Sequence, residues 1–221
     1  KCKKHFIFVV TRKTQISLYF KRIPNIIKPL AKNLVFEFPN DENEIYLTFD
    51  DGPHPELTPW VLDVLKSHEA KATFFLIGSN IKGNEQIVER TLSEGHHIGI
   101  HGYNHLSGWK TKDVEYIADM KKAAEQIESK LCRPPYGEIT RSQAKDLSKQ
   151  FKLIMWSHLS ADFDLSLSPQ DCINHATDKI KSGSIIVFHD SEKAKPRLLG
   201  ALEPSIKYYL EQGFNLMPIP A

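Results

Sequence analysis

The chain has 221 residues, of which 41% are hydrophobic and 25% are charged, and its formal net charge is +2. A chain of this length and composition can bury one sizeable core, so we expect an ordinary globular protein with a single main domain. The three cysteines, Cys2, Cys132 and Cys172, are an odd number without a close pair, which argues against a disulfide framework.

The basic residues are concentrated at the start of the chain. Residues 1–32 contain nine Lys or Arg and no Asp or Glu. The apolar run at residues 6–10 is much shorter than the roughly 20 residues that span a bilayer, and no signal peptide with a long apolar centre is visible. We interpret residues 1–44 as a basic extension that packs on the main domain; an arm that binds an anionic polymer or membrane surface is the alternative.

Two adjacent carboxylates follow the first strand signal. Residues 45–47 are apolar and typical of a strand, which Gly52-Pro53 ends. At the end of a strand, the following turn can bring Asp50 and Asp51 into one cleft, one as a base and the other as a metal ligand. Asp-Asp-Gly-Pro is also typical of a simple turn.

Two histidines follow the next strand-like run, residues 98–100. His101 and His105 are four residues apart, so they share a face if the local turn is helical. With one carboxylate they would form a three-ligand site with an open position for water, the arrangement of a catalytic zinc.

From residue 45 onward, the pattern alternates strands and helices with short connections. We expect further strands at residues 72–77, 151–156 and 184–188, while residues 214–219 close the chain. Helices are expected from Thr58-Pro59, as cap and first position, at 84–94, 113–131, 142–149 and 168–180, the last with a capping box at Ser168, and around 206–212. The helix at 113–131 would bury one stripe, made of Val114, Ile117, Ala118, Ala124, Ile127 and Leu131. Repeated strand–helix units favour parallel strands. Candidate catalytic residues at strand ends fit a barrel whose active site lies on one face.

Five short motifs occur in order along this pattern. They are residues 48–53, residues 101–105, residues 133–137 (Arg-Pro-Pro-Tyr-Gly), Asp162-Phe163 after Trp156, and Ile185, Val187 and His189. Together they resemble the polysaccharide deacetylases of the NodB-homology type, carbohydrate esterase family 4. The resemblance covers residues 45–221 and implies a catalytic domain there, with a distorted (β/α) barrel of about seven parallel strands.

The resemblance also implies roles for individual residues. Asp51, His101 and His105 would hold a metal ion, and Asp50 would be the general base for the attacking water. His189 would be the general acid, and the backbone N–H of Tyr136 would stabilise the oxyanion.

Further residues would support the reaction or contact the substrate. Arg133 and Asp162 would orient the base and the acid, although the sequence does not tell which serves which. The substrate would contact Pro134, Pro135, Trp156, Phe163 and Val187, three of which (Trp156, Phe163 and Val187) would line a pocket for the acetyl methyl group. For Trp156 and Val187, ordinary core packing is an equal alternative.

Three positions depart from the family pattern. Gly102 stands where Ser or Thr is usual, Leu159 where Asp is frequent, and Phe163 where Trp is usual. None of them is a metal ligand, the base or the acid, so the departures concern loop rigidity and substrate fit.

The sequence therefore predicts a metal-dependent hydrolase that removes N-acetyl groups from N-acetylhexosamine residues of a glycan, such as peptidoglycan or a chitin oligosaccharide. An O-acetyl polysaccharide esterase and a catalytically silent carbohydrate-binding homologue are the alternatives. We expect Zn²⁺ as the metal, with Co²⁺, Ni²⁺ or Fe²⁺ also compatible with the ligands. We further expect a monomer in the cell envelope or outside the cell, without a nucleic-acid partner or a transmembrane segment.

Overall fold

The computed structural model describes residues 33–220. The apolar run at residues 6–10 lies outside this range. The strands are β1 (Leu34–Val35), β2 (Glu44–Asp50), β3 (Ala72–Leu76), β4 (His97–Ile100), β5 (Leu131–Cys132), β6 (Lys152–Ile154), β7 (His158–Leu159), β8 (Ile185–His189) and β9 (Asn215–Leu216). The helices are α1 (Leu57–Ser67), α2 (Glu85–Ser93), α3 (Asp113–Ala124), α4 (Arg141–Leu147), α5 (Pro169–Thr177) and α6 (Lys195–Glu211), with short 3-10 turns η2 (Gly78–Asn80) and η3 (Pro135–Gly137).

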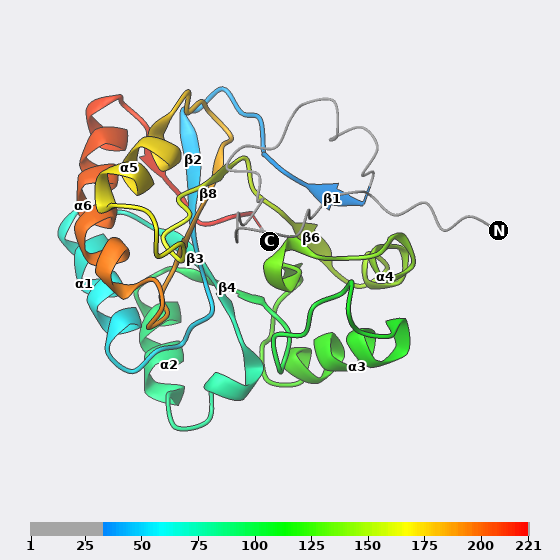
Figure 1. The fold of residues 1–221 in the computed structure, drawn as a ribbon. Coiled ribbons are helices and arrows are strands. Elements are labelled where there is room, and N and C mark those ends of the chain that lie inside the picture. Colours follow the sequence, from blue (N-terminus) through cyan, green and yellow to red (C-terminus); the bar gives the residue numbers. More distant parts are fainter. Residues whose placement is uncertain (1–32, 221) are drawn as a thin grey trace.

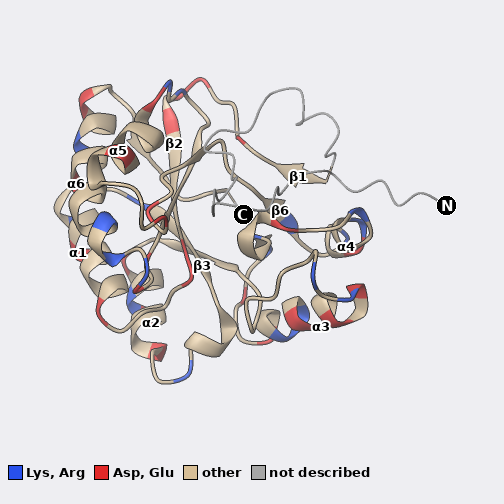
Figure 2. Ribbon diagram, in the orientation of Figure 1, with Lys and Arg blue, Asp and Glu red and all other residues tan. Residues whose placement is uncertain are grey.

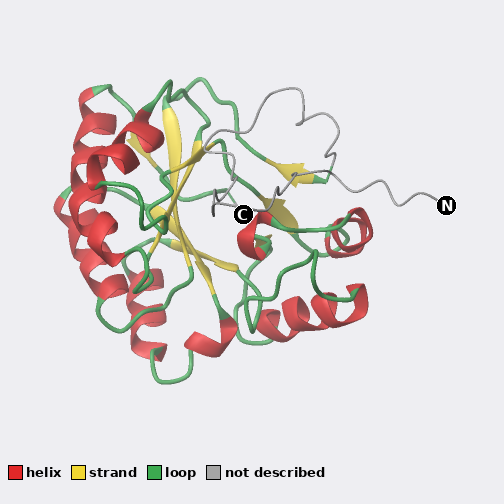
Figure 3. Ribbon diagram, in the orientation of Figure 1, coloured by secondary structure: helices red, strands yellow, loops and turns green. Residues whose placement is uncertain are grey.

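The strands form one sheet in the order β1-β6-β5-β4-β3-β2-β8-β7, with β9 beside β2. All pairings between these strands are parallel. The sheet curves into a half-barrel, and helices cover its outer side (Figures 1 and 3). The expected distorted barrel is thereby confirmed. The part of the sheet in the order β6-β5-β4-β3-β2-β8-β7 has seven parallel strands, and β1 and β9 are short additions.

Residues alternate between the two faces of the sheet along each strand. On β2, Ile45, Leu47 and Phe49 belong to the large core between the sheet and the helices. Tyr46 belongs to a smaller cluster on the inner face, to which Ile185 of β8 also contributes. By the same alternation, the last residues of β2 and β8 are directed to the inner side of the half-barrel, where the sequence places its catalytic residues.

Helix α1 begins two residues earlier than predicted. Its cap position is Glu56, without a side-chain cap hydrogen bond. The Thr58 hydroxyl, which we expected to cap the helix, instead donates to the carboxylate of Asp190. The prediction was wrong because this hydroxyl has a distant partner that local sequence does not reveal.

Helix α3 differs from its prediction in both length and orientation. It ends at Ala124, since the chain must turn to reach β5. Val114 is 83% exposed, and the buried side consists of Tyr116, Asp119, Met120 and Ala123. Within α3 the buried side is therefore not the predicted one, and it includes a carboxylate; Ile127 and Leu131 of the predicted stripe are buried, but they lie beyond the helix. Acidic residues in the first turn and lysines in the last, an order that suits the helix dipole, lie on this helix (Figure 2).

The capping box at the start of α5 is confirmed, with Ser168 and Asp171 bonding reciprocally, although this helix stops at Thr177 and not at residue 180. Of the expected extension, residues 33–44 are described, and β1 pairs with β6. Its separation from the main domain at residue 44 stays a prediction. Within the described range, no helix combines the length and apolar character needed to cross a membrane.

Candidate active site

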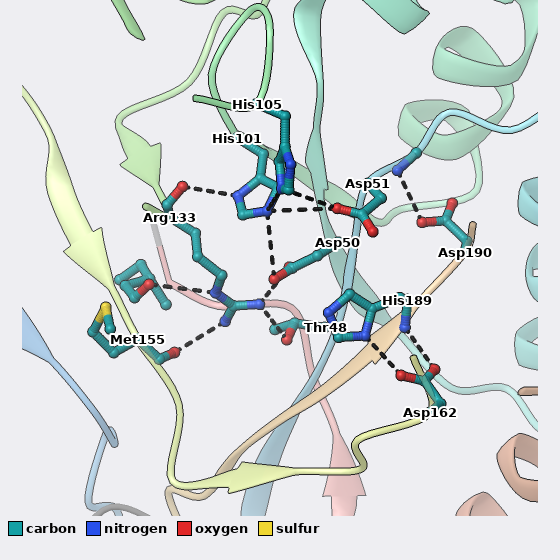
Figure 4. Close-up of polar contacts among 12 residues, drawn as sticks. Thr48, Asp50, Asp51, His101, His105, Arg133, Met155, Asp162, His189 and Asp190 are labelled. Atoms are coloured by element: carbon teal, nitrogen blue, oxygen red, sulfur yellow. Dashed lines mark hydrogen bonds and ion pairs between the residues drawn. The ribbon is translucent and has the colours of Figure 1, made fainter. Parts of the chain in front are cut away.

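The three predicted metal ligands converge at the carboxyl ends of β2 and β4 (Figure 4). Asp51 Oδ1 lies 3.3 Å from His105 Nε2 and 3.8 Å from His101 Nε2, and the two Nε2 atoms are 3.2 Å apart. The turn between the histidines is not helical, so the shared helix face considered above does not apply. Residues 101–105 form a loop in which Gly102 and His105 have φ values of 76° and 54°, and this backbone path brings the imidazoles together.

The protonation of the histidines fits a metal ion. His101 Nδ1 is 2.8 Å from the carbonyl oxygen of Arg133. A carbonyl only accepts, so Nδ1 carries the proton and the Nε2 lone pair faces Asp51 and His105. Burial, followed by the neighbouring His105, holds the pKa of His101 well below its usual value, and burial also lowers the pKa of His105. Neutral imidazoles and a carboxylate are the donors that a divalent cation takes.

Asp50, the last residue of β2, is held by Arg133. The guanidinium is fully buried and donates from Nη1 to Asp50 Oδ1 at 2.6 Å and to Thr48 Oγ1 at 2.7 Å. Its Nη2 donates to the carbonyl of Met155 at 3.0 Å. Burial lowers the pKa of Arg133, and the charge of Asp50 opposes this change. With Oδ1 occupied, Asp50 presents Oδ2 to the metal ligands, 3.8 Å from His101 Nε2.

His189, the last residue of β8, is held by Asp162. The carboxylate accepts from Nδ1 at 2.7 Å and from the backbone N–H of His189 at 2.8 Å. Burial disfavours the charged imidazole, but the charge and hydrogen bond of Asp162, with smaller contributions from Asp51 and Asp50, outweigh this effect and raise the pKa of His189 to about 9. The Nε2 atom therefore carries a proton on the side away from Asp162. The question left open by the sequence is answered: Arg133 contacts Asp50, and Asp162 contacts His189.

Tyr136 lies in η3 with φ of 59°. Its ring is 63% exposed and packs against His105 at 4.4 Å between centroids. Among the described residues, no acceptor bonds its backbone N–H. Pro134 and Pro135, which precede it, are buried.

The other predicted substrate contacts are spread around the site. Phe163 meets His189 edge to face at 5.1 Å. Trp156 is half-buried and packs so closely on Gly137 that a Cβ there would lie 2.4 Å from its ring. Val187, two residues before His189 on β8, is 1% exposed and pairs with Leu159 of β7.

Two buried carboxylates near the site escaped the sequence analysis. Asp190 accepts from the backbone N–H of Gly52 at 3.1 Å and from the Thr58 hydroxyl. Burial raises its pKa to about 7. A Cβ at position 52 would lie 2.3 Å from Asp190 Oδ2, so this turn requires glycine. The second is Asp119 of α3, which bonds the loop that carries the histidines. Asp190 could have been found from the sequence, because it directly follows His189. Finding Asp119 required the correct prediction of which face of the helix is buried.

Residues 38–153 match the sequence model of the polysaccharide deacetylase family, and the chain belongs to this family. It is 34% identical over 193 residues to a peptidoglycan-N-acetylglucosamine deacetylase of Bacillus cereus, with 84% of this chain and 91% of the relative covered. It is 32% identical over 199 residues to a chitooligosaccharide deacetylase of Azorhizobium caulinodans, with coverages of 81% and 94%. The crystal structure of the Bc1960 peptidoglycan N-acetylglucosamine deacetylase superposes with a TM-score of 0.81 at 33% identity, covering 90% of this chain and 95% of that one. The family resemblance and the fold predicted from the five motifs are confirmed.

Proposed function

We propose that this protein is a zinc-dependent N-deacetylase that hydrolyses N-acetyl groups on N-acetylhexosamine residues of a glycan. One observation carries the proposal: the cluster of Asp51, His101 and His105 lies together with two ion pairs. Asp50 is paired with Arg133, and His189 is paired with Asp162. Such a site offers a cation position, a base and an acid at once. The relatives named as N-deacetylases support the same reaction.

Asp51, His101 and His105 would hold the ion. Two imidazoles and one carboxylate are a frequent set for catalytic zinc, and Co²⁺, Ni²⁺ or Fe²⁺ would also fit. When bound, the ion would polarise the acetyl carbonyl and lower the pKa of the attacking water.

Asp50 would take the proton from that water. Its Oδ1 is fixed by Arg133, which leaves Oδ2 directed at the ligand cluster. The water oxygen adds to the carbonyl carbon, and the backbone N–H of Tyr136 would donate to the oxyanion that forms. Its lack of another acceptor among the described residues supports this role.

His189 would complete the reaction. As the C–N bond breaks, the proton on Nε2 passes to the departing amine, and acetate and a free amino sugar are left. The ion pair with Asp162 keeps this proton available at neutral pH, because it raises the pKa of His189 to about 9.

The acetyl methyl group would enter beside Phe163, which contacts His189. Trp156 and Val187 would form the wall and floor of this small pocket, with Pro134 and Pro135 fixing the η3 turn beside it. Because Val187 is fully buried, its contribution would be limited to shape.

Peptidoglycan and chitin oligosaccharides are the substrates we infer, since they are the glycans named for the relatives. Peptidoglycan would place the enzyme in the cell envelope. We also propose that it acts as a monomer and that residues 45–221 form the catalytic domain, with the basic segment 1–44 as an extension.

The decisive experiment measures acetate release from N-acetylglucosamine oligomers, peptidoglycan and O-acetylated xylan. Chelated protein is assayed with and without added zinc, and the metal content of the purified protein is determined. Zinc-restored release from an N-acetylated glycan supports the proposal. Release from xylan alone would establish the esterase, and protein that neither binds metal nor releases acetate would be the silent homologue.

A further inference from the structure

The loop that carries both metal-binding histidines is irregular and is held by hydrogen bonds from outside. Its carbonyl groups accept from η2: Gly102 O from the N–H of Gly78 at 2.9 Å, and Tyr103 O from the N–H of Ser79 at 3.0 Å. Neither bond involves the backbone N–H groups of Tyr103 and Asn104, which need their own acceptor.

Asp119 of α3 is that acceptor. Its Oδ2 accepts from the N–H of Tyr103 at 2.8 Å. Its Oδ1 accepts from the N–H of Asn104 at 3.0 Å and from the Asn104 side-chain amide at 2.7 Å. The carboxylate is 7% exposed, and no cation pairs with it among the described residues. Burying such a group without a cation is costly unless several donors satisfy it, which is what the loop provides.

The two histidines depend on this support to different degrees. His101 has its own anchors, since its N–H donates to the carbonyl of Leu76 at 2.9 Å and its Nδ1 to that of Arg133. Within the described residues, no hydrogen bond reaches Nδ1 of His105. Apart from its contacts with Asp51 and His101, the ring of His105 is directed by the loop backbone and by contact with the Tyr136 ring. A change at Asn104 is therefore transmitted directly to the next residue, His105.

Gly102 and Asp119 are also coupled sterically. A Cβ built at position 102 would lie 3.0 Å from Asp119 Oδ2, and φ at this position is 76°. The absence of a side chain at 102 is what lets the carboxylate approach the loop amides. We propose that Asp119 is a positioning residue of the metal centre: it orders the loop from His101 to His105, and the glycine at position 102 leaves room for its carboxylate to do so.

This inference rests on the proposed metal centre, so its test starts from the affinity of the wild-type apo-protein for Zn²⁺, measured by competition with a chromophoric chelator. Asp119→Ala is expected to weaken Zn²⁺ binding about 10- to 100-fold, the usual effect of losing a residue that supports a ligand. The matched control is Glu115→Ala, which removes the same charge from an exposed position of the same helix. It should change the Kd less than twofold.

The outcomes separate the two proposals. A wild-type protein that binds no metal would refute the metal centre itself. Wild-type binding together with an unchanged Kd in folded Asp119→Ala would overturn the role of Asp119 alone. Asp119→Asn keeps the volume of the side chain and one acceptor oxygen, so it should bind Zn²⁺ with intermediate affinity. If Asp119→Ala does not fold, a wild-type Kd of Asp119→Asn for Zn²⁺ would equally overturn the inference.

A double-mutant cycle tests the coupling to position 102. Gly102→Ser should weaken Zn²⁺ binding clearly in the wild-type background, because its Cβ meets the carboxylate. In the Asp119→Ala background the same substitution should cost several-fold less, since the carboxylate that its Cβ meets is gone. Effects that simply add would contradict the proposed steric coupling of Gly102 and Asp119.

Discussion

The sharpest prediction concerns Asp162→Asn. The substitution keeps the size of the side chain but removes the charge that pairs with His189 at 2.7 Å. Asp162 is fully buried and His189 is 13% exposed, so solvent screens the pair little. Burial alone lowers the pKa of His189, and the ion pair is the main effect that raises it to about 9 from an ordinary value of 6.5.

Without the carboxylate, the pKa of His189 should return to about its ordinary value of 6.5. A change of about 2.5 units corresponds to roughly 3 kcal/mol between the two protonation states. At pH 8 the protonated fraction of His189 would fall from about 90% to about 3%, a roughly 30-fold loss of rate, whereas at pH 6 titration would cost less than about twofold. The sign for stability is the same: the ion pair stabilises the folded protein fully below pH 6.5, and this contribution is lost as the pH rises through about 9.

The assay is kcat/KM for acetate release between pH 5.5 and 10 with saturating zinc. A bound cation moves the alkaline limb of both enzymes to lower pH, so the difference between them is the quantity to compare. The control is Asp164→Asn. The Asp164 carboxylate lies two residues away in sequence and bonds Ser166, so this substitution should leave the alkaline limb of the pH profile in place. An Asp162→Asn enzyme whose activity is reduced equally at every pH would refute the assignment of His189 as the acid.

Three further predictions address the base, the metal ligands and the fold. Asp50→Asn should bind zinc with little change in Kd and lose at least about 100-fold in kcat; near wild-type turnover would show that the base is another group. His105→Ala should lose both zinc binding, measured by chelator competition, and activity, and activity without bound metal would exclude it as a ligand. Leu202→Ala, in the fully buried face of α6, should lower the free energy of unfolding by about 2–5 kcal/mol in urea titrations, while the zinc Kd stays unchanged if stability and the site are separate.

Strong local signals made much of the fold predictable from the sequence. The buried strands β2, β3 and β8 are rich in apolar, aromatic and β-branched residues, and the capping box of α5 is a local pattern, so each was located to within a few residues. The ordered motifs also identified the residues that converge in the site. Neither result required knowledge of long-range packing.

What the sequence did not reveal depends on contacts between distant residues. Arg133 and Asp50 are 83 positions apart, and the strands β5 and β2 beside them are not neighbours in the sheet, so no local pattern reveals their pairing. The helical pattern over residues 113–131 fitted more than one face, and the apolar stripe chosen there left Asp119 on the outside. A helix face chosen only by its apolar residues does not include a carboxylate, because Asp is rarely buried. The error therefore concealed Asp119.

Adjacent Asp50 and Asp51 show how backbone geometry directs two equivalent side chains to different partners. Asp50 is still in the strand, paired with His189 across β2 and β8, and it therefore faces the inner side where Arg133 binds it. At Asp51 the backbone turns to φ of 83°, and the turn is fixed from both sides. Asn80 donates to the carbonyl of Asp51 at 2.9 Å, while Asp190 accepts from the next amide. With equivalent side chains, the ion pair and the register favour the base role for Asp50, and the turn directs the other carboxylate to the histidines.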